Sequence, residues 1–310
     1  MPDNYQKNIS ERGNAKERPA PVLAIGGSDN SCGAGIQMDL KTITALGAHA
    51  MTVVTAVTSQ THNKVSSVSV LYAQDVRTQI QSSLQDFAPA AVKIGMLGNL
   101  EILQVVYEEL LRLKLPNVVL DPVLLASSGN PLITVTNAKE NQNTTKSENS
   151  KKNSELSQSD IASNFIDLFP LTTIITPNIP EAETFTQSKI QNKSDIENAA
   201  TWFLDHGANA VLIKGGHAND NLFSQDYLLQ NKKNEKLNKW ISAKRENTVS
   251  SPHGTGCLFS SAIATYLAKG QNLENSVELA KKQISHAIKN AYATNDNAPV
   301  LRPLHFVDNV

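Results

Sequence analysis

The sequence of 310 residues is poor in the features that mark several specialised classes of protein. It has only 2 cysteines, Cys32 and Cys257, which lie far apart and lack the spacing of metal ligands. This excludes a small disulfide-stapled scaffold and favours a reducing compartment. No apolar run approaches the ~20 residues that cross a bilayer, and the polar start lacks the apolar core of a signal peptide. We therefore expect a cytoplasmic protein without membrane association.

An excess of charge of one sign is also missing. Lys and Arg total 28 and Asp and Glu total 29, which gives a net charge of −1. The basic field that attracts nucleic acids is therefore absent, and a nucleic-acid partner is not expected. The chain contains no GxxxxGK[ST] loop, and its first glycine-rich loop does not have the spacing of a dinucleotide-binding fingerprint. With 40% hydrophobic residues, it has enough apolar material to bury a large core.

Two polar stretches have little to bury. We expect residues 1–19 to be a disordered tail, and residues 134–160, rich in Asn, Ser and Lys, to be a flexible surface insertion. The rest of 20–310 is predicted to form a single domain, because similar elements continue on both sides of the insertion.

Outside these stretches the hydrophobic pattern alternates between the periods of strands and helices. Residues 22–25 predict a strand, and Ile36, Leu40 and Ile43 then fall on one helical face. The later predictions are strands at 51–57, 91–94, 118–120, 173–175 and 210–213, a hairpin of 227–229 with 239–242, helices through Val76 and Leu103, a helix with a capping box at Ser194 and Glu197 that closes at Gly207, and two final helices, the first of which ends near Gly270. Such alternation predicts a three-layer α/β/α fold with a mainly parallel sheet.

Polar residues follow several predicted strands, where ligands bind in such sheets. The loop 26–35, rich in glycine, suits close approach of a ligand or plain turn chemistry. Asp121 suits a magnesium-bound phosphate or a strand-ending turn. Asn178 and Glu181 lie one helical turn apart, so they suit hydrated magnesium with phosphate or an ordinary acidic helix start.

Lys214, Gly215 and Gly216 follow another predicted strand. The lysine can act as a point charge on a polyphosphate, and the glycines leave room for a nucleotide. The alternative is an ordinary surface lysine.

The strongest signal is the sequence HGTGC at residues 253–257, directly before a run typical of a buried helix. Gly254, Thr255 and Gly256 place unpaired backbone amides at a helix start, which forms a cradle for phosphate or an oxyanion. Cys257 then lies in the positive field of that helix start, which predicts a thiol pKa of about 7 to 8 and a role as a base. The alternative is a small inert core cysteine.

All these groups are predicted to lie at one edge of the sheet. Together they indicate phosphoryl transfer from a magnesium-bound nucleotide to a hydroxyl group, in which catalysis consists mostly of positioning and charge neutralisation.

The motifs resemble a known family. In order and spacing, PVLAIGGSDNSCGAGIQMDLKTITALGAHAMTVVTAVTSQT, AVKIGML, VVLDPVLLASSGNPL, TPNIPEAE, VLIKGGH and SPHGTGC are similar to the hydroxymethylpyrimidine and hydroxymethylpyrimidine-phosphate kinases of thiamine biosynthesis, members of the ribokinase-like superfamily. The resemblance runs from about Pro21 to Ala291, apart from the insertion.

This resemblance implies a ribokinase-like fold, ATP as phosphoryl donor, Mg²⁺, and 4-amino-5-hydroxymethyl-2-methylpyrimidine and its monophosphate as substrates. It also implies a homodimer. The roles that it implies are pyrimidine binding by Asp39 and Gln60, a pocket lined by Gly27 and Met96, nucleotide binding by Asn178, Lys214, Gly215 and Gly216, metal binding by Asp121 and Glu181, an anion hole at Gly254, Thr255 and Gly256, and a catalytic base at Cys257.

The sequence departs from the family pattern at three positions. Cys32 replaces a usual glycine, Thr61 a usual asparagine, and Ser127 a common lysine near the phosphates, which makes the second phosphorylation less certain than the first. Pyridoxal kinase activity is the nearest alternative, and a non-catalytic pyrimidine-binding regulatory protein is the alternative from another class.

Overall fold

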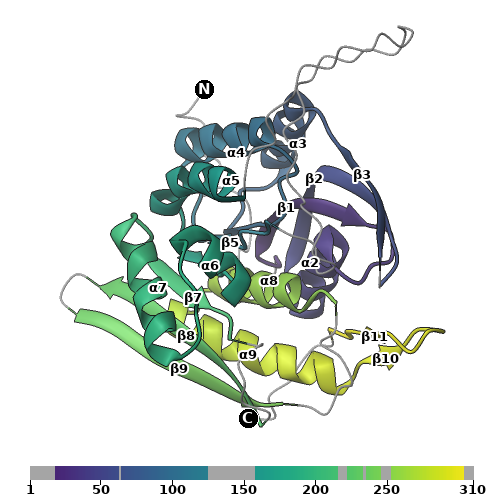
Figure 1. Cartoon of the computed structure of the whole chain (residues 1–310). Helices are drawn as coiled ribbons and strands as arrows, with labels where there is room; N and C mark the ends of the chain where they lie inside the picture. The colour runs from purple at the N-terminus through teal and green to yellow at the C-terminus, as the bar shows by residue number, and fades with distance from the viewer. Residues whose placement is uncertain are drawn as a thin grey trace, which may run out of the picture.

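The computed structural model describes residues 18–62, 64–124, 158–215, 222–232, 235–245 and 253–303. A 9-stranded sheet runs through its centre in the order β3-β2-β1-β4-β5-β6-β7-β8-β9 (Figure 1). The neighbours from β2 to β7 are parallel, and β3, β8 and β9 add antiparallel pairs at the two edges. The strands are β1 (Pro21–Asp29), β2 (His49–Gln60), β3 (Val65–Val70), β4 (Ala91–Ile94), β5 (Val118–Leu120), β6 (Ile174–Ile175), β7 (Ala210–Ile213), β8 (Phe223–Lys232) and β9 (Glu235–Lys244), with a separate pair of β10 (Tyr292–Ala293) and β11 (Pro299–Val300).

Helices cover both faces of the sheet (Figure 1). One face carries α3 (Ala73–Asp86), α4 (Leu100–Leu113), α5 (Gln158–Phe165), the 3₁₀ helix η1 (Ile166–Leu171), α6 (Ile179–Thr186) and α7 (Lys193–Asp205), and the other carries α2 (Gly35–Ala45), α8 (Thr255–Ala268) and α9 (Leu273–Lys289). Successive residues of a strand point to opposite faces, so Leu23 and Ile25 of β1 enter the first core while Val22 and Ala24 enter the second. The predicted three-layer α/β/α fold is confirmed.

The strand order reverses direction between β1 and β4. The chain passes from β1 to β2 on one side and returns to β4 on the other. In open parallel sheets ligands bind at such a switch point, beyond the carboxyl ends of the strands. The fold therefore places the binding edge where β1 and β4 end.

Local patterns predicted several elements to the residue. Strands β4, β5 and β7 have the predicted bounds, and Gly207, with φ of +98°, follows α7 as expected. Strand β1 is longer than predicted, because it continues through Gly26 and Gly27 to Asp29. The edge strand β3, which consists of three valines and three serines, was not predicted.

Two local predictions were wrong. The capping box of α7 consists of Asn192 and Asp195 rather than Ser194 and Glu197, because the Asn192 side chain accepts the Asp195 N–H while the Asp195 side chain accepts the Asn192 N–H. Leu40 does not belong to the buried face of α2 and is 44% exposed. The buried face includes polar groups that α8 covers, and hydrophobic spacing alone does not reveal such a face.

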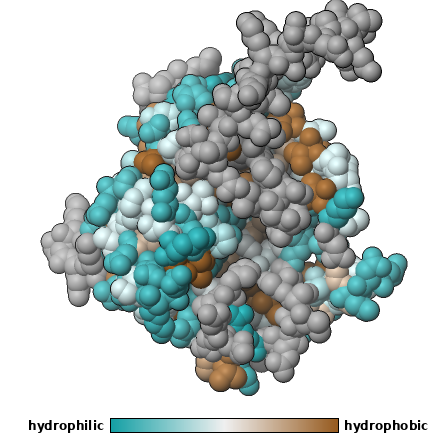
Figure 2. Space-filling view, viewed as in Figure 1, coloured by the Kyte–Doolittle hydropathy of each residue, from teal (hydrophilic) through white to brown (hydrophobic). Residues whose placement is uncertain are grey.

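The predicted tail and insertion lie mostly outside the described residues. Residues 158–160 of the predicted insertion belong to α5, so its expected end at 160 was placed too late. In the part of the chain that is described, no helix is both long and apolar enough to cross a membrane. Figure 2 shows a largely hydrophilic surface over α7 and the β8–β9 hairpin.

Candidate active site

A buried ion pair joins the ends of two strands. Asp121 follows β5, and Lys214, which follows β7, donates from Nζ to Asp121 Oδ1 at 2.6 Å. Thr176 and Ser260 place hydroxyl groups at 3.3 Å from the two carboxylate oxygens. Burial raises the pKa of Asp121, but the positive charge of Lys214 and that of Lys93 outweigh burial and hold it below its usual value. Asp121 is therefore an ionised carboxylate in the interior.

Asn178 and Glu181 form the start of α6 beside this pair. Asn178 Oδ1 accepts the Glu181 N–H and Glu181 Oε2 accepts the Asn178 N–H, each at 2.8 Å, which is a capping box. Burial raises the pKa of Glu181 to about 7. The positive charge of Lys214 lowers this pKa, and the negative charge of Asp121 raises it. Two carboxyl groups thus share one lysine in a buried place.

The start of α8 reaches the same place. Gly254 is the residue before the first turn and has φ of +83°. A Cβ atom on Gly256 would lie 3.4 Å from Lys214 Nζ and 3.5 Å from Asp121 Oδ2. The start of α8 therefore lies next to the lysine and the carboxylate. The lysine and the helix-start amides favour an anion, and the carboxylate can hold a cation beside it.

The glycine-rich loop packs against this helix start. Asp29 organises the loop by accepting N–H groups of Ser31, Gly33 and Ala34, and its Oδ2 lies 3.6 Å from His253 Nε2. Cys32, which replaces a usual glycine, has φ of +57°, in the left-handed region that glycine prefers.

Cys257 lies in the first turn of α8, and its side chain is partly buried. The backbone N–H of Gly35, at the start of α2, lowers the pKa of the thiol. The predicted pKa of about 7 to 8 is wrong. Burial raises the pKa of the thiol to about 11, Lys93 lowers it, and Asp39 and Asp121 raise it further. The electric field of the helix start was the only influence on this pKa that the sequence revealed. The effect of burial on the pKa is larger than the effect of that field.

The predicted pyrimidine-pocket residues gather at the switch point. Gly27 of β1 and Met96 after β4 are neighbours, because a Cβ atom on Gly27 would lie 2.9 Å from Met96 Sδ. Gln60 is the last residue of β2, and its N–H donates to Asn30 Oδ1 of the glycine-rich loop at 2.7 Å.

Asp39 differs from the other predicted ligands, because the protein encloses it. Its side chain is 0% exposed, Oδ2 accepts from Lys93 Nζ at 2.9 Å, and Oδ1 accepts from Ser261 Oγ at 2.7 Å. Both carboxylate oxygens therefore have partners inside the protein, and contact with a pyrimidine remains a prediction.

Several residues of the site were missed from the sequence. Thr176 and Ser260 contact Asp121 but carry no local signal, because their partner belongs to a distant segment. Lys93 did have a signal, since it is the charged residue of a four-residue strand that is otherwise apolar and fully buried. Gly215 binds the Asp226 carboxylate through its N–H, and Gly216 lies outside the described residues.

The donor set fits a magnesium ion held together with phosphate. Mg²⁺ is usually bound by one or two carboxylates, with waters and phosphate oxygens completing its ligands. Asp121 and Glu181 are two such carboxylates, and burial raises the pKa of Glu181 to about 7, so a cation beside it would favour its ionised form. Among the described residues no group of three or more His, Cys, Asp and Glu side chains is arranged to hold a metal by itself.

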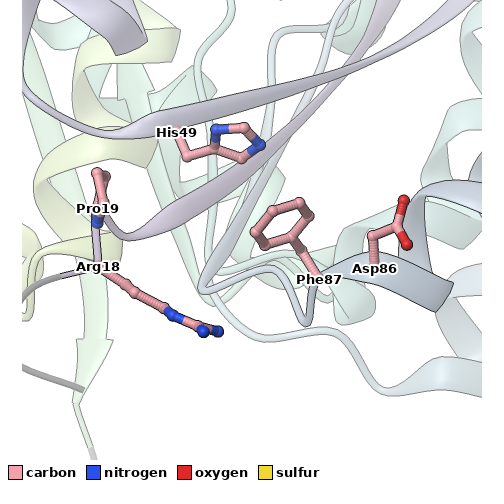
Figure 3. Close-up of a pocket in the computed structure, with 5 residues that line it drawn as sticks. All are labelled: Arg18, Pro19, His49, Asp86 and Phe87. Atoms are coloured by element: carbon pink, nitrogen blue, oxygen red, sulfur yellow. The ribbon is translucent and has the colours of Figure 1, made fainter. Parts of the chain in front are cut away.

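A separate pocket of about 510 Å³ opens at the other edge of the sheet, where β1 and β2 begin. Figure 3 shows the rings of His49 and Phe87 facing each other there, with a centroid separation of 4.5 Å. Arg18, Pro19 and Asp86 complete its lining. It includes none of the predicted site residues.

Comparison with known proteins identifies the family. Residues 29–146 and 149–301 match the phosphomethylpyrimidine kinase family. A hydroxymethylpyrimidine/phosphomethylpyrimidine kinase of Haemophilus influenzae is 37% identical over 276 residues, covering 86% of this chain and 90% of the relative. A phosphomethylpyrimidine kinase structure from Clostridium difficile 630 has a TM-score of 0.68 and 36% identity over 87% of this chain and 99% of that one. A Bacillus subtilis pyridoxal kinase in an ADP complex has a TM-score of 0.76 and 27% identity over 92% and 97%. The chain therefore belongs to the phosphomethylpyrimidine kinase family, phosphotransferases that pass a phosphoryl group from ATP to a small molecule.

Proposed function

We propose that this kinase phosphorylates 4-amino-5-hydroxymethyl-2-methylpyrimidine on its hydroxyl group and then phosphorylates the monophosphate to the diphosphate. One observation carries the proposal. Asp121 after β5 and Lys214 after β7 form an ion pair at 2.6 Å, and a Cβ atom on Gly256, at the amide-rich start of α8, would lie within 3.5 Å of both side chains. This is the set of charges that binds and stabilises a transferring phosphoryl group.

Each group has a role in this proposal. Asn178 and Lys214 bind the nucleotide phosphates, with Gly215 and Gly216 beside them, and Asp121 and Glu181 hold Mg²⁺. When bound, the ion supplies positive charge that neutralises the phosphate oxygens. Gly27, Asp39, Gln60 and Met96 form the pyrimidine side, and the amides of Gly254, Thr255 and Gly256 form the anion hole.

The chemical step transfers one proton and one phosphoryl group. The Cys257 sulfur, as thiolate, takes the proton of the substrate hydroxyl while the hydroxyl oxygen bonds to the γ-phosphorus. The bond from that phosphorus to the bridging oxygen breaks, and its electron pair leaves with ADP. The amides of the α8 start stabilise the charge of the transferring group. Because burial raises the pKa of Cys257 to about 11, only a small fraction of the free enzyme holds the thiolate at neutral pH.

Product analysis tests the proposal directly. The purified protein is incubated with the pyrimidine, ATP and MgCl₂. The monophosphate and diphosphate products are separated by chromatography and identified by mass spectrometry. We expect both products, with the diphosphate appearing after the monophosphate. ATP consumption that does not depend on the pyrimidine, or the absence of both products, contradicts the proposal.

Pyridoxal is the second candidate substrate. The TM-score to the pyridoxal kinase of Bacillus subtilis, 0.76, exceeds that to the phosphomethylpyrimidine kinase of Clostridium difficile, 0.68. The kcat/KM values for the two alcohols, measured with the same enzyme preparation, separate the candidates. We expect the pyrimidine to be preferred, and a clear preference for pyridoxal overturns that assignment.

We also propose that the kinase is a homodimer, on the basis of the resemblance to its superfamily. Light scattering coupled to size-exclusion chromatography measures the mass against 33.6 kDa for one chain. A mass of a single chain across micromolar concentrations contradicts the proposal.

A further inference from the structure

A lysine is enclosed between the two halves of the site. Lys93 belongs to β4, its side chain is 1% exposed, and its Nζ donates to Asp39 Oδ2 at 2.9 Å. A Cβ atom on Gly95 would lie only 2.7 Å from this Nζ, so the glycine leaves the room that the ammonium group occupies. A buried ammonium is costly unless negative charge faces it. The interior around Lys93 must therefore supply negative charge.

Asp39 connects this lysine to the start of α8. Ser261 Oγ donates to the second oxygen of Asp39 at 2.7 Å. Ser261 follows Cys257 by one helical turn in α8, and Asp39 follows Gly35 by one turn in α2, so each pair shares a helix face. The hydrogen bond between Asp39 and Ser261 therefore joins the two helices one turn below their starts, where Gly35 and Cys257 lie.

We propose that Lys93 is a positioning residue of the kinase site, whose ammonium group balances the negative charge that forms on the Cys257 sulfur when the thiol gives up its proton. This inference rests on the proposed role of Cys257 as the base. Lys93 acts through the cysteine and through Asp39, and it needs no contact with the substrate.

The charges that face Cys257 come from four elements. Asp39 belongs to α2, Lys93 to β4, Asp121 follows β5 and Lys214 follows β7. Both carboxylates oppose a thiolate and both lysines favour it. Lys214 is bound to Asp121 at 2.6 Å and is assigned to phosphate. Among the described residues, Lys93 has one hydrogen-bond partner, Asp39, and its positive charge is the main influence that lowers the pKa of the Cys257 thiol.

Alkylation of the cysteine tests the inference without substrate, ATP or metal. In a Cys32→Ser background, the rate of Cys257 modification by iodoacetamide is measured from pH 7 to pH 11 by mass spectrometry. Lys93→Met is expected to slow the reaction at pH 9 about tenfold, which corresponds to one unit of pKa. Asp39→Asn is expected to accelerate it, because that variant removes a negative charge near the sulfur.

The opposite signs distinguish charge from packing. A purely structural role of this cluster predicts that both variants loosen the helix starts, expose the sulfur and accelerate alkylation. An unchanged or faster rate in Lys93→Met overturns the inference. Lys269→Met is the matched control, because Lys269 donates to Leu46 O at the other end of α2, and its rate should equal that of the parent.

A second variant keeps the test decisive if Lys93→Met does not fold, since it leaves Asp39 buried without its cation. Lys93→Met/Asp39→Asn removes both charges and is expected to react more slowly than Asp39→Asn alone. Equal rates overturn the inference. The alkylation rate is measured in the free enzyme, so it can be interpreted even if the proposed substrate is wrong. Likewise, failure of this inference about Lys93 would not affect the product analysis that tests the substrate.

Discussion

Burial and charge compete at Cys257, and the outcome sets the chemistry expected of this residue. The amides of two helix starts favour a thiolate there, yet the pKa of the thiol rises to about 11 because the partly buried sulfur loses part of its hydration. A base of high pKa accepts a proton strongly once it is ionised, but the ionised fraction increases with pH.

Cys257→Ala is expected to lower kcat about a hundredfold or more, the usual contribution of a positioned base, and to change KM for the pyrimidine little. Steady-state kinetics of the parent and the variant give both parameters. For the parent we also expect kcat/KM to rise through pH 8 to 9, because the pKa of the thiol lies above this range. An undiminished kcat in the variant removes the proposed role, and a pH-independent kcat/KM in the parent argues against thiolate formation.

At the scale of elements, the contact between the start of α8 and the glycine-rich loop holds the site together. A Cβ atom on Gly254 would lie 1.9 Å from Gly33 O, so the two backbones touch. This contact joins segments from opposite ends of the sequence. His253 Nε2 also lies 3.6 Å from Asp29 Oδ2 of the same loop. No side chain other than hydrogen fits between the loop and the helix start.

Gly254→Ala and Gly270→Ala separate this contact from backbone strain. The two glycines have φ of +83° and +85°, but the space around Gly270 is open to at least 4 Å. Gly270→Ala is expected to cost about 1 kcal/mol, the strain of a left-handed alanine. Gly254→Ala should cost clearly more and should also reduce kcat, because the anion hole shifts. Urea denaturation measures the loss of unfolding free energy in each variant, and steady-state kinetics measure kcat. Equal losses of free energy in the two variants would show that the glycine-rich loop moves to accommodate the added methyl group.

A second pair of elements is joined by a buried carboxylate. Glu109 of α4, 2% exposed, accepts from Arg77 of α3 at 2.8 Å and from Gln81 at 3.0 Å, and it also pairs with Arg112. Burial raises the pKa of Glu109, but these hydrogen bonds and charges outweigh it and hold the pKa below its usual value. A lowered pKa gives stability above the unfolded-state value, and that stability is lost as the pH falls through the folded-state value.

Glu109→Gln is therefore expected to reduce the free energy of unfolding at pH 7 by about 2 kcal/mol, because it leaves arginine donors without their charged acceptor. The difference from the parent should shrink as the pH falls below about 4, the usual range of a glutamate in the unfolded chain, because the unfolded parent then binds a proton that the folded parent does not. Urea denaturation at the two pH values measures it. Glu108→Gln is the control, since that side chain is 45% exposed and pairs with the same arginine, and its effect should be much smaller. A pH-independent loss would assign the effect to packing.

At the scale of the whole molecule, a continuous sheet with cores on both faces carries the site. The described segments on either side of residues 125–157 pack in one hydrophobic cluster, which includes Leu120 from before the gap and Phe165 from after it. The described chain on the two sides of these residues therefore belongs to one core.

Replacement of residues 134–155 by a short Gly-Ser linker is expected to leave a single thermal transition, at a Tm within a few degrees of the parent, and the first phosphorylation intact. Calorimetry and product analysis measure these properties. A deletion extended through residue 165 is the control, because it removes α5, whose Ile161, Ala162 and Phe165 are buried. That deletion should unfold the protein or lower its Tm strongly. Loss of folding in the shorter replacement would show that the stretch packs on the domain.

The sequence by itself determined what depends on neighbouring residues. Period and length predicted β4, β5 and β7, and polar groups after strands indicated Asp121, Asn178, Glu181 and Lys214, because parallel strands bring their carboxyl ends to one edge. Gly256 was predicted from another local rule, that a glycine-rich helix start presents unpaired amides.

Only the tertiary structure decided what depends on water and on distant partners. The enclosure of Asp39 by Lys93 and Ser261, the last of which is 222 positions away, carries no local signal. The raised pKa of Cys257 was likewise beyond sequence reasoning, because the loss of solvation at a sulfur atom is set by every segment packed around it, while the helix field that favoured a low pKa comes from its own turn.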